Sequence, residues 1–425
     1  MRILHYTLGF PPHRTGGLVK YSIDLMEEQQ KNGNEVSVLY PGEQSFFHRK
    51  CNIRKKNRDT IVKYELNNGL PLALFGGIIN PDIFMEEIDR SIYFEFLNEI
   101  KPDIIHIHTL MGIHKEFFEV AKQLKIKMIF TTHDYYGLAP DPAFYANGVS
   151  FDEENTNESW NLMSQNAMSI KKLYLFQSKY YPLIRKIGKV IVRIKKNEKP
   201  ENNQLREYKD FSLLKNYYKS VFDLIDIFHF NSTQTKDVYM KNGIIPSFSE
   251  VIPVTNYNIK KENFVEKKVK NKKSVIAYIG PDKEYKGYFD FIKLAELLDR
   301  DKYEVRTYGH KPKDKCPGFI RQFGRFDSMK SRAVYSEIDI LIVPSKWKET
   351  FGLIVLEGVS FGVKVFVSDS VGAKEILEKE DIFTNYICLA EQLNNEKIEV
   401  KKITNFPDMS EHCGKLLDVY KNGVK

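Results

Sequence analysis

Residues 344–353 read PSKWKETFGL, and this stretch stands between an apolar run and an apolar helical pattern. Residues 338–344 predict a buried strand, and residues 353–361 predict a helix. A loop that leads from a strand directly into a helix exposes backbone N–H groups at the positive end of the helix dipole. The stretch therefore predicts an anion site of the phosphate-binding kind at the edge of a parallel sheet.

The same strand–loop–helix unit recurs along the whole chain. In the first half the expected strands are 2–9, 35–40, 103–108, 127–132, 225–231 and 250–253, and the expected helices are 18–31, 114–124 and 233–242. After a charged linker at 259–273, the expected strands are 275–280, 303–309, 338–344 and 364–368. The expected helices of this half are 288–298, 329–336 and 353–361, and a further helix starts at 373–377. This alternation predicts an α/β protein with two Rossmann-like domains that face each other across a cleft, residues 1–255 and 256–404.

Composition narrows the class of protein. The chain has 425 residues, of which 42% are hydrophobic, and this excludes a wholly disordered protein. Its four cysteines show neither paired nor CxxC spacing, which fits a reducing compartment and argues against structural zinc. We see no signal peptide and no apolar run of about 18 residues, so we expect a cytoplasmic protein.

Residues 141–219 fit the alternation poorly and carry the strongest charge. Ten of the residues 171–199 are Lys or Arg, and only Glu198 is acidic. Residues 183–194 predict an amphipathic helix, for which two interpretations stay open: contact with an anionic membrane surface, or packing on the first domain. We do not expect nucleic acid as a partner, because no nucleic-acid-binding motif is present and the charge is local.

The carboxylates Glu349 and Glu357 flank the expected phosphate site. A carboxylate suits hydroxyl groups because it accepts hydrogen bonds in fixed directions. Two of them beside a phosphate loop indicate a ligand with hydroxyls on both sides of its phosphates, which is the form of a nucleotide sugar. The alternative is that Glu349 caps the helix and Glu357 faces solvent. A second loop, Gly16-Gly17 between a strand and a helix, fits either a plain turn or a second phosphate contact.

Two further patterns resemble metal motifs. His106 and His108 lie on one face of a strand, where a metal pair is one interpretation; we favour structural roles because no third ligand has metal spacing. Asp299 and Asp301 form a DxD pattern that follows a helix, so we interpret it as a solvated turn. We expect no metal and no cofactor.

Together these residues resemble a known family. Glu349 and Glu357 match the E-x7-E motif of retaining glycosyltransferases with the GT-B fold, of the family 4 (GT4) type, within a similar P-S-x-x-x-E-x-F-G-L context. Weaker matches follow in the right order: RILHY with its Gly-Gly loop, DIIHIH, THD at residues 132–134 and YKG at residues 285–287. The resemblance covers most of the chain outside residues 141–219.

The resemblance implies roles for single residues. Donor contacts are implied for the loop Gly16-Gly17, for Lys286 at the leaving diphosphate, for Glu349 at the sugar hydroxyls, for Thr350, Phe351, Gly352 and Leu353 at the diphosphate and sugar, and for Glu357 at the ribose. His133 would lie near the reacting sugar, so the implied catalytic set is His133, Glu349 and Lys286. A helix at about 405–425 would pack back on the first domain.

Two departures from the family pattern matter. Pro281 stands where the family often has an Arg that contacts phosphate, and Lys283 is a candidate replacement. Residues 254–257, VTNY, replace the usual N-G-V/I-D. The resemblance implies transfer of a hexose from a UDP- or GDP-sugar to a hydroxyl acceptor, lipid-linked or glycan, in bacterial surface polysaccharide assembly. The alternatives are a nucleotide-sugar 2-epimerase of the same fold and a catalytically silent partner subunit.

Overall fold

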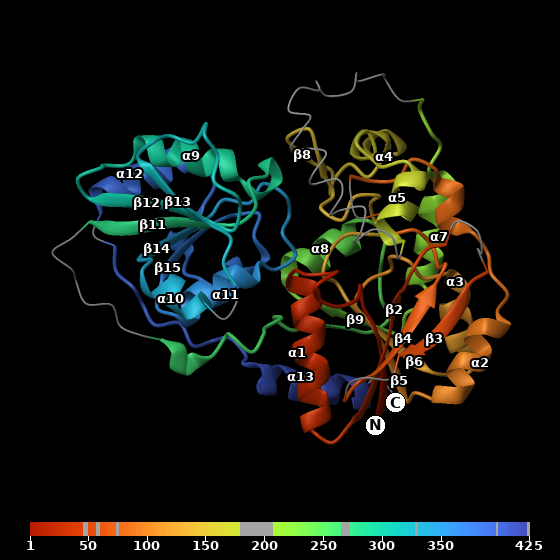
Figure 1. Ribbon diagram of the computed structural model, residues 1–425. Coiled ribbons are helices and arrows are strands. Elements are labelled where there is room, and N and C mark those ends of the chain that lie inside the picture. The colour runs from red at the N-terminus through yellow and green to blue at the C-terminus, as the bar shows by residue number, and fades with distance from the viewer. Residues whose placement is uncertain are drawn as a thin grey trace.

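Two sheets, one from each half of the chain, form the framework of the protein (Figure 1). The computed structural model describes all residues except 46–49, 57–59, 74–75, 179–206, 265–272, 328–329, 397 and 423–425. In spatial order the first sheet is β10 (Ser249–Val251), β9 (Ile227–Phe230), β6 (Lys127–Thr131), β5 (Ile104–Ile107), β1 (Arg2–Tyr6), β2 (Glu35–Pro41), β4 (Val62–Asn67) and β3 (Asn52–Lys56). The second is β13 (Ile320–Gly324), β12 (Tyr303–Tyr308), β11 (Ser274–Ile279), β14 (Ile340–Val343), β15 (Lys364–Ser368) and β16 (Ile382–Phe383).

All strand pairs of both sheets are parallel except the edge pair β3–β4. The helices of the first half are α1 (Gly17–Lys31), α2 (Ser91–Ile100), α3 (Lys115–Gln123), α4 (Asn157–Met163), α5 (Ile170–Gln177), α7 (Ser212–Phe222) and α8 (Thr233–Lys241). Those of the second half are α9 (Tyr288–Leu297), α10 (Ser331–Ser336), α11 (Leu353–Ser360), α12 (Tyr386–Asn395) and α13 (Met409–Asn422). This architecture confirms the predicted α/β class with two parallel-sheet domains.

The central strands are buried because helices cover both faces of a parallel sheet. Every residue of β5, β14 and β15 is buried. One apolar cluster joins the two halves of the chain: it contains Tyr21 of α1, Leu356 of α11 and Leu416 of α13. The last helix, α13, lies against α1 of the first domain (Figure 1), so the end of the chain is part of the packing beneath the cleft.

Some elements differ from the sequence-based expectation. The expected helix at 373–377 is a single 3-10 turn, η5 (Gly372–Ile376). Its first N–H groups donate to the carbonyls of Glu349 and Phe351, and the turn ends at Leu377, where the backbone is extended. Strand β3 was not predicted, because the edge sequence NIRKK is largely exposed and shows no apolar alternation. The pattern Asp299–Asp301 lies in a turn after α9 whose residue Asp301 is exposed, as predicted.

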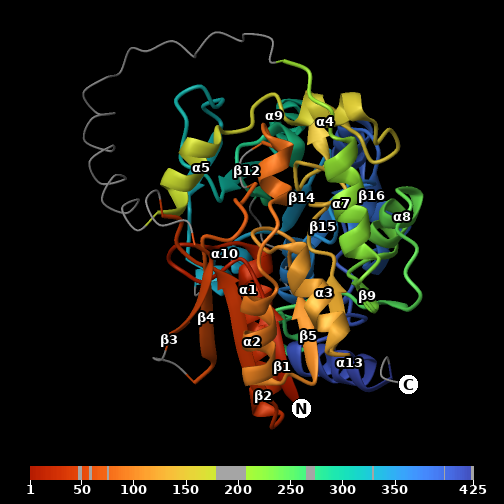
Figure 2. The ribbon, with the colours of Figure 1, turned by 90° about the vertical axis from the view of Figure 1, so that its right-hand side faces the viewer.

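The segment 141–219 holds several short elements. The described part contains the hairpin β7 (Tyr145–Ala146) and β8 (Val149–Ser150), followed by α4, α5 and α7. Figure 2 labels these three helices. Helix α7 buries Leu214 and Tyr218 in the first core. The amphipathic helix expected at 183–194 lies outside the described residues. No helix within the described part of the chain is long and apolar enough to cross a membrane.

Candidate active site

A cavity of about 350 Å³ lies between the two domains, at the carboxyl ends of their strands. Parallel α/β sheets bind ligands at this edge, because the loops that follow the strands converge there. From the first domain the lining residues include Gly17, Leu18, His133 and Asn231. From the second they include Pro281, Lys286, Ser345, Trp347, Glu349, Thr350, Phe351, Gly352, Leu353 and Ile354. The structure thus brings together most of the residues that the sequence singled out.

Lys286 and Glu349 form an ion pair inside this cavity. Lys286 Nζ lies 2.7 Å from Glu349 Oε1, and the two side chains are 23% and 13% exposed. Ser345 Oγ donates to the other oxygen, Glu349 Oε2, at 2.5 Å. The lysine ammonium also lies 4.8 Å from the centre of the Trp347 ring. The cation expected for a diphosphate and the carboxylate expected for sugar hydroxyls are therefore directly coupled, which the sequence did not reveal.

A glycine holds Lys286 in place. Lys286 ends the 3-10 turn η3 (Glu284–Lys286), and Gly287 follows with φ +71°. A Cβ atom at Gly287 would lie 1.7 Å from the carbonyl oxygen of Pro344, at the end of β14. Only glycine permits this approach, because any side chain would overlap the main chain of the neighbouring loop. The Tyr285-Lys286-Gly287 turn is thereby fixed against the start of the PSKWKETFGL segment.

The N-terminus of α11 forms the floor of the cavity. Gly352 is the residue before the helix, with φ +97°, and residues 351–354 all line the cavity. Thr350 Oγ1 donates to the carbonyl of His133 at 2.9 Å, which connects the loop to the opposite domain. Backbone N–H groups and the helix dipole together favour an anion here. The geometry therefore suits a phosphate group between α11 and Lys286.

The opposite wall contains a second helix N-terminus. Gly16, with φ +128°, precedes α1. A Cβ atom at Gly17 would lie 3.6 Å from Leu353 Cδ1, so the Gly-Gly loop faces the start of α11 at contact distance. Two helix N-termini thus approach the same space from the two domains.

His133 follows β6 and lines the cavity from the first domain. Burial, and after it the neighbouring His229, lower the pKa of His133 to about 3, so the ring is neutral at pH 7. Its Nε2 lies 3.3 Å from His108 Nδ1, behind the cavity wall. A neutral ring offers a directional hydrogen bond to a ligand rather than a charge.

Sequence reasoning missed Asn231, which follows β9. Its amide nitrogen donates to the carbonyl of Thr132 at 2.8 Å, while its buried Oδ1 has no hydrogen-bond partner among the described residues. A buried acceptor without a partner is costly, and Asn231 lines the cavity, so a ligand hydroxyl would satisfy it. The available signal was its position at the carboxyl end of an expected strand.

Glu357 lies further along α11 and is not among the residues that line the cavity. Tyr335 OH donates to Glu357 Oε2 at 3.0 Å, and Asn256 Nδ2 donates to Oε1 at 3.3 Å. Burial raises the pKa of this carboxyl group. Asn256 belongs to the VTNY sequence that replaces the usual family pattern, so that segment supports Glu357. A role for Glu357 at a ribose remains a prediction.

Pro281, which stands where the family often has an arginine, leaves no cation at this point of the cavity lining. Pro281 lines the cavity at the expected position of the arginine, whereas Lys283 is exposed and is not a lining residue. Among the described residues that line the cavity, Lys286 is the one lysine or arginine. Lys286 and the helix N-termini therefore supply the positive potential on their own.

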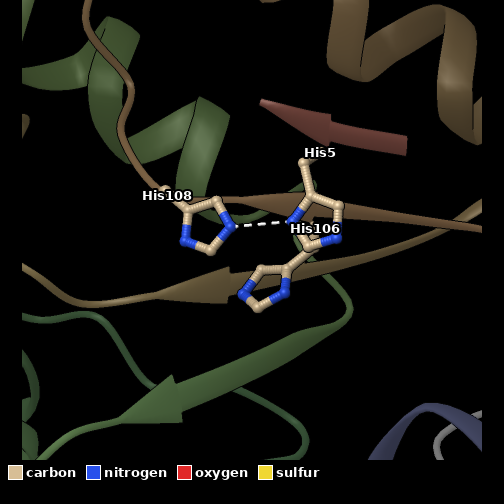
Figure 3. Close-up of side chains that lie close together, drawn as sticks. All are labelled: His5, His106 and His108. Atoms are coloured by element: carbon tan, nitrogen blue, oxygen red, sulfur yellow. Dashed lines mark hydrogen bonds between the residues drawn. The ribbon is translucent and has the colours of Figure 1, made fainter. Parts of the chain in front are cut away.

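The pair His106 of β5 and His108, just after β5, has a third member. His5 of β1 lies beside His106 in the parallel register, and His108 completes a buried cluster (Figure 3). Sequence reasoning looked for a third ligand at nearby positions in the chain, whereas the third ring comes from the adjacent strand, about 100 residues earlier.

Two family models match separate parts of the chain. Residues 259–415 match the model described as glycosyl transferases group 1, and residues 15–154 match the glycosyltransferase family 4 model. An uncharacterized 42.6 kDa protein in the cps region of Klebsiella pneumoniae is 25% identical over 405 residues, which is 92% of this chain and 90% of that protein.

Solved structures show the same fold. A glycosyltransferase from Rickettsia africae ESF-5 gives a TM-score of 0.58 at 15% identity and covers 100% of this chain and 98% of that one. The lipopolysaccharide outer core galactosyltransferase WaaB gives 0.57 at 12% identity, with 99% and 100% covered. Anabaena Alr3699/HepE in complex with UDP and glucose gives 0.52 at 10% identity, with 98% and 95% covered.

Proposed function

The chain belongs to the glycosyltransferases of the GT-B fold and GT4 type, and from this premise we propose that it transfers a hexose from a UDP- or GDP-sugar to a hydroxyl acceptor with retention of configuration. One observation carries the proposal: the Lys286–Glu349 pair lies in the interdomain cavity beside the N-terminus of α11. This arrangement combines an anion site with a carboxylate that suits hydroxyl groups, as a nucleotide sugar requires.

In this proposal the leaving diphosphate lies between Lys286 and the N–H groups at the start of α11. Preorganised charges and dipoles act most strongly where charge develops, and the diphosphate gains charge as the sugar departs. Glu349 would then exchange part of its contact with Lys286 for the sugar hydroxyls. The acceptor would attack from the side of the leaving group, which retains configuration. No step requires a metal ion.

The domain contact supports alignment of donor and acceptor. Thr350 O accepts hydrogen bonds from Ser232 Oγ and Thr235 Oγ1, both at 2.7 Å, at the start of α8. The donor loop is thus attached to the first domain, which would carry the acceptor. Holding both substrates in one geometry lowers the entropic cost of the reaction.

We further propose a role in surface polysaccharide assembly at the cytoplasmic face of the membrane, with a lipid-linked or glycan acceptor. The relative from the cps region of Klebsiella pneumoniae supports this context. The basic residues 171–199 would supply peripheral contact with anionic lipid, although most of them lie outside the described residues. Flotation with anionic liposomes tests this part, and a protein that does not float with them contradicts it.

A thermal-shift titration with UDP, GDP, ADP and dTDP, followed by the matching sugars, tests the donor class. A ligand at about 100 times its Kd stabilises the folded protein by roughly 2.7 kcal/mol. A shift with UDP or GDP and their sugars is the expected result. The absence of a shift with every nucleotide would favour a catalytically silent subunit, the alternative that Pro281 in the phosphate region supports.

A further inference from the structure

Beneath the cleft, buried side chains of the first domain form a row of hydrogen bonds whose direction is fixed at one end. His229 Nε2 lies 2.7 Å from the carbonyl oxygen of Ile252, and since a carbonyl only accepts, this nitrogen carries the proton. His229 Nδ1 therefore accepts from the hydroxyl of Thr131 at 2.8 Å. The Thr131 oxygen accepts in turn from His106 Nε2 at 2.6 Å, and His106 Nδ1 accepts from Tyr420 OH at 2.6 Å.

The second half of the row continues in the same direction. Because Tyr420 donates to His106, its oxygen accepts from Gln29 Nε2 at 2.9 Å. Gln29 Oε1 accepts from His5 Nε2 at 2.7 Å, and His5 Nδ1 accepts from His108 Nε2 at 2.9 Å, the dashed line in Figure 3. His108 Nδ1 then accepts from Nε2 of His133 at 3.3 Å. The amide orientation that the row requires is the one present in the structure.

The row of hydrogen bonds requires each imidazole ring to be neutral, and burial keeps the rings neutral. Burial lowers the pKa of His5 and of His229 to about 4. The pKa values of His106 and His108 are also lowered well below their usual range, first by burial and then by the neighbouring rings. Each ring therefore has one N–H donor and one acceptor nitrogen at pH 7.

The row also accounts for the three-histidine cluster without a metal ion. Nitrogen atoms of His5, His106 and His108 lie within 4.8 Å of one another, a spacing that would suit a metal. All six ring nitrogens, however, already have hydrogen-bond partners in the row. Coordination of an ion would break several of these bonds at once.

We propose that Gln29 is a positioning residue, which acts through His5 and His108 to keep the proton of His133 on Nε2 and to leave Nδ1 as an acceptor toward the cleft. His133 lines the cavity, and among the described residues the one hydrogen-bond partner of its ring is His108, at Nε2. An acceptor at this point selects a sugar with a hydroxyl there and disfavours a carboxylate, whose oxygens would face a lone pair. The sugar ligand rests on the proposed function, whereas the tautomer is a property of the protein alone.

Two substitutions of Gln29 keep the length of the side chain. They separate an effect on the direction of the hydrogen bonds from an effect on packing. Gln29→Glu keeps an acceptor for His5 Nε2, so His133 should keep its proton on Nε2. Gln29→Met offers no acceptor to His5 Nε2, so the direction of the hydrogen bonds from His5 to His133 is no longer fixed. The Nδ1–H form of His133 should then appear. Both variants lose the amide donor to Tyr420, and Gln29→Glu also buries a carboxyl group, so the melting temperature of each variant is measured first to show that it is folded.

The measurement is the pair of ring ¹⁵N signals of His133 in histidine-labelled protein without ligand at pH 7, assigned by comparison with His133→Asn. We expect the Nε2–H form in the wild type and in Gln29→Glu, and a mixture in Gln29→Met. A transfer assay with the donor found by thermal shift should then show about a tenfold loss for Gln29→Met, the weight of one hydrogen bond.

Three results would overturn the proposal. The first is a wild-type His133 with its proton on Nδ1. The second is an unchanged tautomer in a folded Gln29→Met protein. The third is a change of the ring signals on addition of equimolar Zn²⁺, since that would assign the cluster to a metal. If the tautomer behaves as expected and no nucleotide binds, the proposed function fails and this proposal stands.

Discussion

The two domains use the same strand–loop–helix unit but bring opposite kinds of polar groups to the cleft. The first domain buries neutral imidazoles, with His5, His106 and His108 in one connected cluster. The second domain places an ion pair, Lys286 and Glu349, at the start of a helix. Of the described histidines in the second half of the chain, His310 follows β12, and His412 belongs to α13, which packs on α1 of the first domain.

This difference indicates that the two domains act on different parts of a ligand. Charges and helix dipoles act over distance and stabilise a developing negative charge. Neutral rings act at contact distance, and their protonation state is kept only while they stay buried. The second domain is therefore suited to stabilise a leaving group, and the first to select and orient hydroxyl groups.

Acid should affect the first domain selectively and most strongly. The pKa values of His5 and His229 fall from 6.5 to about 4 on folding, so the unfolded chain binds more protons between these values. Their stabilisation is complete above pH 6.5 and is lost as the pH falls toward 4. At pH 5 each ring costs about 2 kcal/mol, or about 4 kcal/mol for the two.

Hydrogen exchange at pH 7 and pH 5, corrected for intrinsic rates, measures this loss strand by strand. Protection should decrease in β1, β5 and β9, while β11 and β14 of the second sheet serve as the internal control. An equal decrease in both sheets would contradict the comparison.

Lys286→Ala tests the charged site. Removal of one preorganised group at a developing charge typically lowers kcat by about 10²–10³. Lys283→Ala is the matched control, because this lysine is exposed, lies three residues away and is outside the cavity lining. We expect the control to stay within about twofold of wild type in a steady-state transfer assay. A large loss for Lys283→Ala would show that it replaces the arginine absent at Pro281.

Much of this second-domain site could be predicted from the sequence because its residues are close along the chain. The segment 344–353 contains a strand end, a loop and a helix start, and local patterns specify such units. The coupling of Glu349 to Lys286 spans 63 residues and required the sheet order. The pattern therefore identified Glu349 and the family resemblance identified Lys286, but neither revealed their contact.

The first-domain site could be predicted only in part, because its order depends on strand register. His106 and Thr131 were on expected strands, but only the parallel pairing β1–β5 and β6–β9 brings His5 and His229 beside them. Gln29 and Tyr420 are joined across 391 residues by the packing of α13 on α1. A one-residue change of register would turn these side chains to the other face, and no local pattern fixes it.

Gly287→Ala should weaken the second domain without touching a charge. The new Cβ would lie 1.7 Å from Pro344 O in a backbone conformation that favours glycine, so the turn carrying Lys286 must move. We expect a loss of stability of about 2 kcal/mol together with lower activity. Gly318→Ala is the control, since nothing lies within 4 Å of its added Cβ. Urea unfolding of both variants measures the difference, and equal midpoints would be inconsistent with a strained turn.

The smallest effect on nucleotide binding is expected when the exposed hydrogen bonds between the two domains are removed. Glu375 Oε1 accepts from Gln234 N at 3.1 Å, and Oε2 accepts from Thr233 Oγ1 at 3.3 Å, at the N-terminus of α8. Glu375 is exposed, so water and salt screen it, whereas Thr350 O and its two hydroxyl donors are buried.

Glu375→Ala should therefore weaken nucleotide binding by about twofold at low salt and by less in high salt, as measured by calorimetry. Ser232→Ala removes one of the buried donors and should cost more at either salt concentration, since burial shields that bond from screening. The prediction is contradicted if Glu375→Ala weakens binding more than Ser232→Ala does and the effect persists in high salt. In that case the exposed bonds of Glu375, and not the buried bonds to Thr350 O, would hold the two domains together.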